Sequence, residues 1–170
     1  HPWTRMARQR HGCYASPTKR PHGQVNHSRM DWRQRYADKL TTPKEAVRAV
    51  RDGDRVVIGM HYQTPLALCR ALAARGRELR GVEIENSIAT FISWWEDDEP
   101  NNFAVRSFFL QASDRPAMRK GLLDYVIAPP TRSDASYWLD RTPDVFLVSI
   151  SPPDDDGWCS FGMSVWGAPE

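Results

Sequence analysis

The sequence contains no apolar run that approaches the roughly 18 residues a membrane-spanning helix requires, and no signal peptide is visible. Cysteine is scarce, because Cys13, Cys69 and Cys159 make an odd number with no close pair. A disulfide framework is therefore not expected, and a reducing compartment is the default. The histidine and cysteine spacings match no zinc pattern. These absences predict a soluble, cytoplasmic protein with no metal site.

Acidic residues are missing from residues 1–30, a segment with six arginine or lysine side chains and no apolar periodicity. The rest of the chain holds the other 17 of the 23 basic residues and all 21 acidic ones, a net charge of −4, which argues against a nucleic-acid groove there. The basic segment has three interpretations: a mitochondrial transit peptide, a nucleic-acid-binding arm, or a disordered leader outside the fold. The last is favoured, with the folded domain over residues 31–170.

Apolar patterning begins after this segment, in a chain of 170 residues that suits one ordinary domain. Thr42 can cap a helix that Pro43 opens and Gly53 ends, with Glu45 at the capping-box position. The β-branched run at residues 55–60 is typical of a buried strand. A helix is followed here by a strand, and this alternation continues along the chain.

A second cap-plus-proline signal, Thr64 before Pro65, predicts a helix over residues 66–79, and a strand over residues 82–90 follows it. The remaining elements alternate in the same way. Strands are predicted over residues 103–110, 124–129 and 144–151, helices over 113–122 and 133–141, and a loop over 94–102. Strands that alternate with helices predict an α/β fold with an open, mostly parallel sheet and flanking helices.

Two loops follow the carboxyl ends of predicted strands, which is where open parallel sheets bind ligands. In the first, a glycine permits close backbone approach. The next helix offers its N–H groups and positive dipole end to an anion. His61, in this loop, is the one histidine outside the basic segment. The candidate substrate-binding residues are Gly59, Met60, His61, Tyr62, Gln63 and Thr64.

The second loop is the stretch SISPPDDDGWCSFG at residues 149–162, which leaves the most apolar of the predicted strands. Its prolines stiffen the strand exit, because each fixes its own φ and favours an extended predecessor. Asp154 is expected to accept hydrogen bonds from loop amides, and Asp155 and Asp156 are expected to be solvated. A simpler interpretation, in which both loops are tight connectors, stays open. This loop is expected to form one wall of the ligand-binding cleft. The residues expected there are Ser151, Pro152, Pro153, Asp154, Gly157, Cys159, Ser160 and Gly162.

The phrase SPPDDDGWCSFGMSV resembles the S-P-P-D-x-x-G-x-C-S-x-G-x-S-V signature of the acetyl-CoA hydrolase/transferase family, which includes acetate, succinate and 4-hydroxybutyrate CoA-transferases. The resemblance covers roughly residues 31–165. Upstream it includes W-x-x-x-Y-x-x-K-L at 32–40, E-A-V…DGDRVVIG at 45–59, P-x-x-L…ALAAR at 65–75 and VRSFFLQASDRPAMRKGLLDYV at 105–126.

This resemblance implies an N-terminal α/β domain of CoA-transferase type, which in longer relatives faces a second domain across the active site. It implies an acyl-CoA thioester as substrate, with no permanently bound cofactor, a small carboxylate as acceptor, and a place in acetate metabolism. In the family a glutamate attacks the thioester, and a glutamyl-CoA thioester carries CoA to the acceptor. That glutamate lies in the second half of the family's sequence. No catalytic residue is therefore expected in this chain, and the terminal Glu170 is out of motif.

The family's loop after the first strand usually consists of small residues, whereas this chain has Met60, His61, Tyr62 and Gln63 there, so the acyl and acceptor specificity stays open. Two hypotheses stand. In the first, the chain is the N-terminal part of a CoA-transferase or acetyl-CoA hydrolase that is inactive without the missing half and forms a homo-oligomer at full length. In the second, it is a non-catalytic α/β small-ligand-binding or interaction module. A thiol nucleophile at Cys159 lacks an identifiable base nearby in the sequence.

Overall fold

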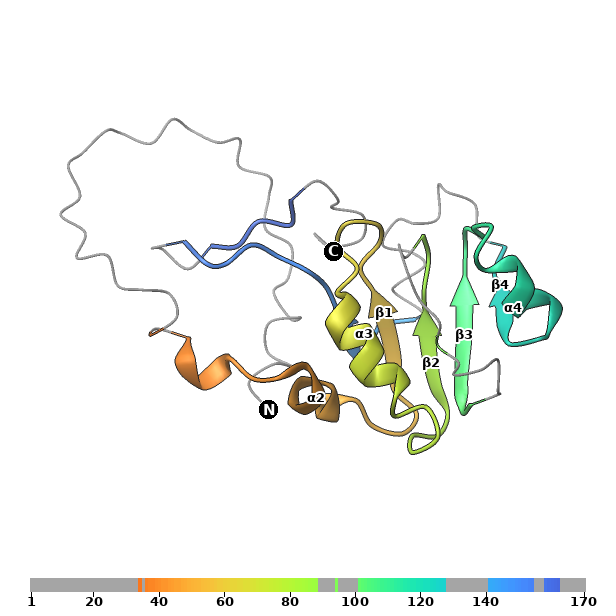
Figure 1. The fold of residues 1–170 in the computed structure, drawn as a ribbon, viewed down its shortest axis with the longest axis horizontal. Helices are drawn as coiled ribbons and strands as arrows, with labels where there is room; N and C mark the ends of the chain where they lie inside the picture. Colours follow the sequence, from red (N-terminus) through yellow and green to blue (C-terminus); the bar gives the residue numbers. More distant parts are fainter. Residues whose placement is uncertain are drawn as a thin grey trace.

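The computed structural model of the chain describes residues 34, 36–88, 94, 101–127, 141–154 and 158–162. Five strands form a single parallel sheet (Figure 1), which confirms the predicted α/β class and its open parallel sheet. Predictions for residues 1–30, for the helix at 133–141 and for Asp155, Asp156 and Gly157 lie outside the described residues. The strands are β1 Arg55–Ile58, β2 Val82–Glu85, β3 Phe103–Ser107, β4 Leu123–Tyr125 and β5 Val145–Leu147.

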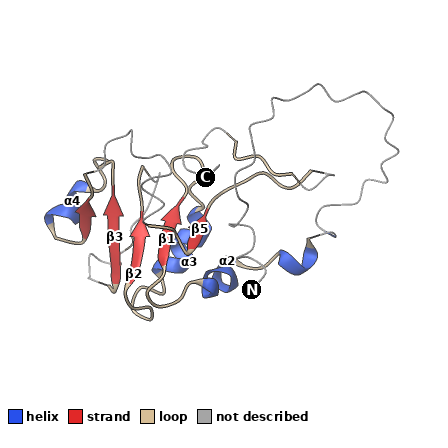
Figure 2. Ribbon diagram, turned by 180° about the vertical axis from the view of Figure 1, so that it is seen from behind, coloured by secondary structure: helices blue, strands red, loops and turns tan. Residues whose placement is uncertain are grey.

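The strand order is β4-β3-β2-β1-β5, and each neighbouring pair is parallel. The chain therefore adds β2, β3 and β4 on one side of β1 and places β5 on the other side, as the rear view shows (Figure 2). Ile58 at the end of β1 pairs with Leu147 at the end of β5. The strand order reverses between these two strands, and such reversals are where open parallel sheets hold ligands.

One face of the sheet is apolar and packs beneath the helix α3, Leu66–Ala73 (Figure 1). Residues along a strand point alternately to the two faces, and β1 alternates between half-buried and buried positions as this requires. Cys69 and Leu72 of α3 are fully buried against the sheet. The sheet contributes Val56, Ile58, Val82, Ile84, Phe103, Val105, Leu123 and Leu147 to this core.

The first predicted helix begins as the sequence indicates. Thr42 is the N-cap of α2, Pro43–Ala46, and its hydroxyl accepts a hydrogen bond from the Glu45 amide at 3.2 Å. The helix is shorter than predicted, because a 3₁₀ turn, η3 Val47–Ala49, replaces its second half. The prediction that Gly53 ends the helix is wrong, because η3 ends at Ala49 with Val50 as its C-cap. Gly53 lies in the following turn, with a left-handed φ of 78° that favours glycine.

Two predictions about the second helix are wrong. Thr64 does not cap α3; Pro65 occupies the N-cap position, and the Thr64 hydroxyl donates instead to the Gly59 carbonyl at 2.9 Å. Gly59 is buried just past the end of β1, and a buried carbonyl requires a donor. The helix also ends at Ala73 rather than at residue 79, although Leu79 is still buried.

The strand β5 and the loop at residues 94–102 also differ from expectation. The strand β5, predicted as the most apolar, is a short edge strand of the described sheet, and its Phe146 is exposed. Trp94, in the predicted loop, is buried and packs edge-on against Phe103. A short helix, α4 Arg115–Arg119, packs beside β4. None of the helices described is long and apolar enough to cross a bilayer.

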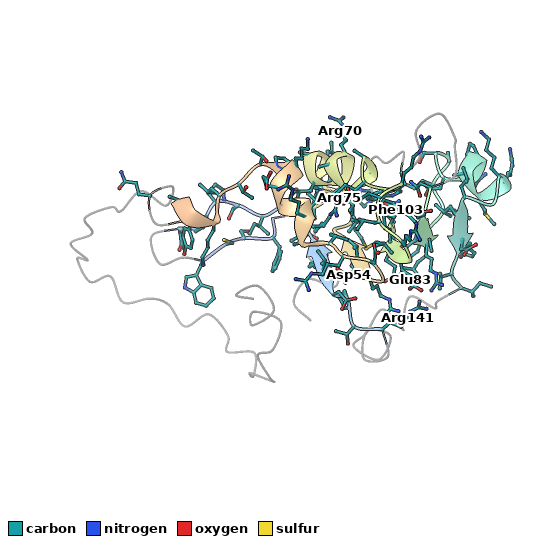
Figure 3. All side chains as sticks on the ribbon, turned by 90° about the horizontal axis from the view of Figure 1, so that it is seen from below. Asp54, Arg70, Arg75, Glu83, Phe103 and Arg141 are labelled. Carbon is teal, nitrogen blue, oxygen red and sulfur yellow. The ribbon has the colours of Figure 1, made fainter. Side chains whose placement is uncertain are left out.

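The opposite face of the sheet carries a charged cluster centred on Glu83. Its carboxylate pairs with Arg55 at 3.2 Å, with Arg141 at 3.0 Å and with Arg106 at 3.4 Å. Figure 3 shows Glu83 and Arg141 together on the side of the sheet away from α3. Because Arg55 and Arg106 lie on the strands flanking β2 and Arg141 precedes β5, one carboxylate ties four parts of the chain together.

Candidate functional site

The loop after β1, residues 59–65, turns tightly at the reversal of strand order. The Gly59 amide donates to the Leu147 carbonyl of β5 at 2.8 Å, which extends the ladder between the two strands past the end of β1. The Gln63 amide donates to the Met60 carbonyl at 3.0 Å and closes the turn. A Cβ at Gly59 would lie 2.8 Å from the Gln63 carbonyl oxygen. Glycine is therefore required here for the packing of the loop on itself, and the predicted approach of a ligand to this backbone stays a prediction.

His61 and Ile88 join the loop after β1 to the end of β2. The His61 amide donates to the Ile88 carbonyl at 2.9 Å, and both residues have positive φ, 51° and 48°. Such angles are strained outside glycine, above all for β-branched isoleucine. The imidazole of His61 stacks with the Tyr62 ring, with the centroids 6.0 Å apart, and both side chains are exposed. The loop thus holds two aromatic rings at its surface.

Gln63 joins the loop after β1 to both ends of the loop at residues 149–162. Its carbonyl accepts from the Ser149 amide at 2.8 Å, and its side-chain Nε2 donates to the Phe161 carbonyl at 3.4 Å. The side chain is buried, and its Oε1 has no hydrogen-bond partner among the described residues. The two loops proposed from the sequence therefore meet through one residue.

The loop at residues 149–162 is closed by hydrogen bonds between its own two arms. The Trp158 amide donates to Asp154 Oδ1 at 2.8 Å and the Asp154 amide to the Trp158 carbonyl at 2.9 Å, which confirms that Asp154 binds a loop amide. The Ser160 amide donates to the Ser151 hydroxyl at 2.8 Å. The segment extends past the β5 edge of the sheet, on the side away from α4 (Figures 1 and 2). Trp158, Cys159 and Ser160 are exposed on it.

Two free cysteines lie in the described part of the chain, Cys69 in the core and Cys159 exposed on the loop at 149–162. The N-cap residue of α3, which directly follows the loop at 59–65, is Pro65, and its side chain makes no capping hydrogen bond. Burial raises the pKa of the Cys69 thiol to about 12, so this cysteine stays protonated and unreactive. Within the described ranges, no three His, Cys, Asp or Glu side chains gather to hold a metal ion.

The structure places the predicted residues at two depths. Gly59, Gln63 and Thr64 are buried, Met60 is half-buried, and His61 and Tyr62 are exposed. In the second loop Ser151 and Pro153 are half-buried, whereas Pro152, Asp154, Cys159, Ser160 and Gly162 are exposed.

Sequence reasoning missed the carboxyl end of β2, where Asn86 and Ser87 are buried and the Ser87 hydroxyl accepts from the Phe108 amide at 2.9 Å. The sequence indicates these residues, because the polar pair Asn86 and Ser87 directly follows β2, the next strand along the chain after β1.

Comparison with known proteins gives one family. The model of the acetyl-CoA hydrolase/transferase N-terminal domain matches residues 24–170. The match begins inside the segment that was expected to lie outside the fold. Among solved structures, RipA from Yersinia pestis superposes with a TM-score of 0.63 at 27% identity, over 78% of this chain and 34% of that one.

Three curated relatives are CoA-transferases. The 4-hydroxybutyrate coenzyme A transferase of Clostridium kluyveri is 29% identical over 79% of this chain and 32% of its own length. The succinyl-CoA:cyclohexane-1-carboxylate CoA transferase of Geobacter metallireducens is 28% identical, over 83% and 32%. The butyryl-CoA:acetate CoA-transferase of Anaerostipes caccae is 30% identical, over 79% and 31%. The chain thus spans about a third of the length of these relatives.

Proposed function

This chain belongs to the acetyl-CoA hydrolase/transferase family, matching its N-terminal domain, and we propose that it serves an enzyme that moves coenzyme A between an acyl-CoA thioester and a small carboxylate. The relatives that support this are CoA-transferases with different acids in their names. The coenzyme A thioester is a substrate here, and water is the competing acceptor if the enzyme is a hydrolase.

The observation that carries the proposal is the junction of two loops at the reversal of strand order. Gln63 binds Ser149 and Phe161, so the loop after β1 and the loop at 149–162 form one continuous surface. That surface lies at the carboxyl edge of the sheet, where parallel sheets bind ligands. The N-terminus of α3, which begins at Leu66, lies beside it, and the positive end of a helix dipole favours an anion such as the acid's carboxylate.

In this proposal residues 59–64 contact the acyl group or the acceptor acid, and the closed loop at 149–162 is a wall of a cleft shared with a second domain. The nucleophile is a glutamate in the part of the relatives that this chain does not match. It attacks the thioester and forms a glutamyl-CoA intermediate, which the acceptor carboxylate then resolves. Among the described residues, Cys69 is a buried thiol and Asp154 is engaged with its own loop, so neither is suited to take the nucleophile's place.

The test is an exchange assay with acetyl-CoA and a labelled carboxylate. The 170-residue chain alone is expected to give no label in the CoA thioester, and the same chain supplied with a second domain of the family is expected to give transfer. Transfer by the chain alone that disappears on changing Asp154 or Cys159 would place a nucleophile in this half and refute the assignment. No transfer in either arrangement would favour the alternative, a non-catalytic small-ligand-binding or interaction module.

A further inference from the structure

The loop after β1 presents a rigidly held pair of aromatic rings to solvent. Tyr62 is 72% exposed, and its ring stacks with that of His61 at an interplanar angle of 28°. A single exposed aromatic residue is ordinary on a protein surface. A stacked pair at the ligand-binding edge of a parallel sheet is different, because the outer face of Tyr62 is available to a third ring.

The backbone that carries this pair is strained at His61. His61 and Ile88 are the non-glycine residues with positive φ among the described residues, and one hydrogen bond joins them. Costly angles of this kind persist where the surrounding contacts over-determine them, often at ligand-binding positions. Here those contacts include the bonds of Thr64 to Gly59 and of Gln63 to Ser149. The backbone beneath the two rings is therefore held by contacts with neighbouring segments.

We propose that the His61–Tyr62 pair is a specificity-determining element that selects carboxylic acids with a planar body, aromatic or conjugated, over saturated acids of the same size. The inference rests on the proposed function, because it assigns the acid to that site. A flat ring can lie offset on the exposed face of Tyr62, with His61 supporting the opposite side of the stack. A puckered saturated ring of equal carbon number contacts the same face less closely and lacks the matching π surface.

Benzoate and cyclohexanecarboxylate form a matched pair of probes, since both carry one carboxylate on a six-carbon ring and differ in planarity. Saturation-transfer NMR titrations of the 170-residue chain with each acid measure the two dissociation constants. We expect benzoate to bind about two- to tenfold more tightly, the range typical of an added aromatic pair. Tyr62→Phe should keep this preference, and Tyr62→Leu should bring the ratio to about one.

Tyr125 provides the control, because it is 47% exposed on β4, at the edge of the sheet away from this site. Tyr125→Leu should leave the ratio unchanged. The inference is overturned if neither acid binds, if the two bind equally to the parent chain, or if Tyr62→Leu keeps the preference. Tyr62→Gln repeats the test with a polar side chain, and the dispersion of amide NMR signals checks that each variant is folded.

Failure of this inference is distinguishable from failure of the proposed function. A preference for benzoate that depends on Tyr62, in a protein that exchanges no thioester even with a second domain, would support the ring pair and refute the CoA-transferase assignment. Thioester exchange together with an acid preference that does not depend on Tyr62 would support the CoA-transferase assignment and refute the ring pair.

Discussion

At the scale of single residues, the contact between Gly59 and Gln63 decides the shape of the loop after β1. An added Cβ at Gly59 would lie 2.8 Å from the Gln63 carbonyl oxygen and 2.9 Å from its Cβ. Neither atom can move aside like the end of a flexible side chain, because the same carbonyl accepts from Ser149. The backbone at residue 59 therefore packs so closely on the backbone at Gln63 that no side chain fits at residue 59.

Gly59→Ala is expected to destabilise the chain by about 1–3 kcal/mol, the usual cost of forcing extra volume into a packed site. The free energy of unfolding in urea measures this. Gly121→Ala is the control, because Gly121 has a φ of 70° with nothing within 4 Å of an added Cβ. Gly121→Ala should lower the free energy of unfolding only by the cost of a left-handed φ in alanine, roughly 1 kcal/mol. A Gly59→Ala chain as stable as the parent would show that the loop relaxes.

Glu83 is the residue on which the charged face depends. Burial raises the pKa of its carboxyl group, but the hydrogen bond from Arg55 and the charge of Arg106 outweigh this and hold the pKa below its usual value. The carboxylate and its three arginines are each less than a third exposed. Removing the carboxylate would leave three partly buried guanidinium groups close together.

Glu83→Gln is expected to cost about 1–2 kcal/mol at pH 7, between the values for surface and buried ion pairs. Because the folded-state pKa is lowered, this stabilisation is complete above about pH 5 and is lost as pH falls through the unfolded and then the folded pKa. Urea unfolding at pH 7 and at pH 3.5 tests this, since the gap between parent and variant should narrow at the lower pH. A gap that stays constant would mean that the carboxyl does not titrate as argued.

At the scale of elements, Arg75 joins the end of α3 to the 3₁₀ turn η3. Its guanidinium donates to the carbonyls of Val47 and Val50, the latter at 3.1 Å, and its side chain also pairs with Glu78. Figure 3 places Arg75 beside α3. The Val47 carbonyl also accepts from the Val50 amide at 3.1 Å, so the guanidinium of Arg75, just past the end of α3, adds donors to the last carbonyls of the 3₁₀ turn. This explains how two short elements keep a fixed mutual position.

Arg75→Met keeps the apolar stem and removes the donors, and we expect it to cost about 1.5–3 kcal/mol, as for hydrogen bonds from charged groups. Thermal unfolding followed by circular dichroism measures the loss. Arg77→Met is the matched control, because Arg77 is exposed and should change stability by less than about 0.5 kcal/mol. Equal losses for the two variants would show that the bonds to η3 contribute little.

At the scale of the whole molecule, the open question is how much of the N-terminal segment takes part in the fold. Deleting residues 1–30 is expected to leave the unfolding midpoint unchanged within error, because this segment has no apolar periodicity with which to pack on the domain. Deleting residues 1–23 is the control, since the family match begins at residue 24. A midpoint that drops by several degrees for the longer deletion alone would assign residues 24–30 to the fold.

The sequence by itself determined the fold class, the position of most strands and the start of the first helix, because these depend on local patterns. The strand at residues 55–58 and the cap at Thr42 each involve residues a few positions apart. The sequence also identified the two loops and the hydrogen bond of Asp154 within its own turn. Short-range stereochemistry is sufficient for all of these features.

Only the tertiary structure decided that β5 lies at an edge, that Trp94 is buried in the core and that Thr64 supports Gly59 instead of capping α3. It also decided that Gln63 joins the two loops through a carbonyl 98 residues away. The physical reason is that a buried polar group takes whichever partner the folded chain brings within reach. The order of the strands in the sheet decides which segments become neighbours, and a local sequence pattern does not contain that order.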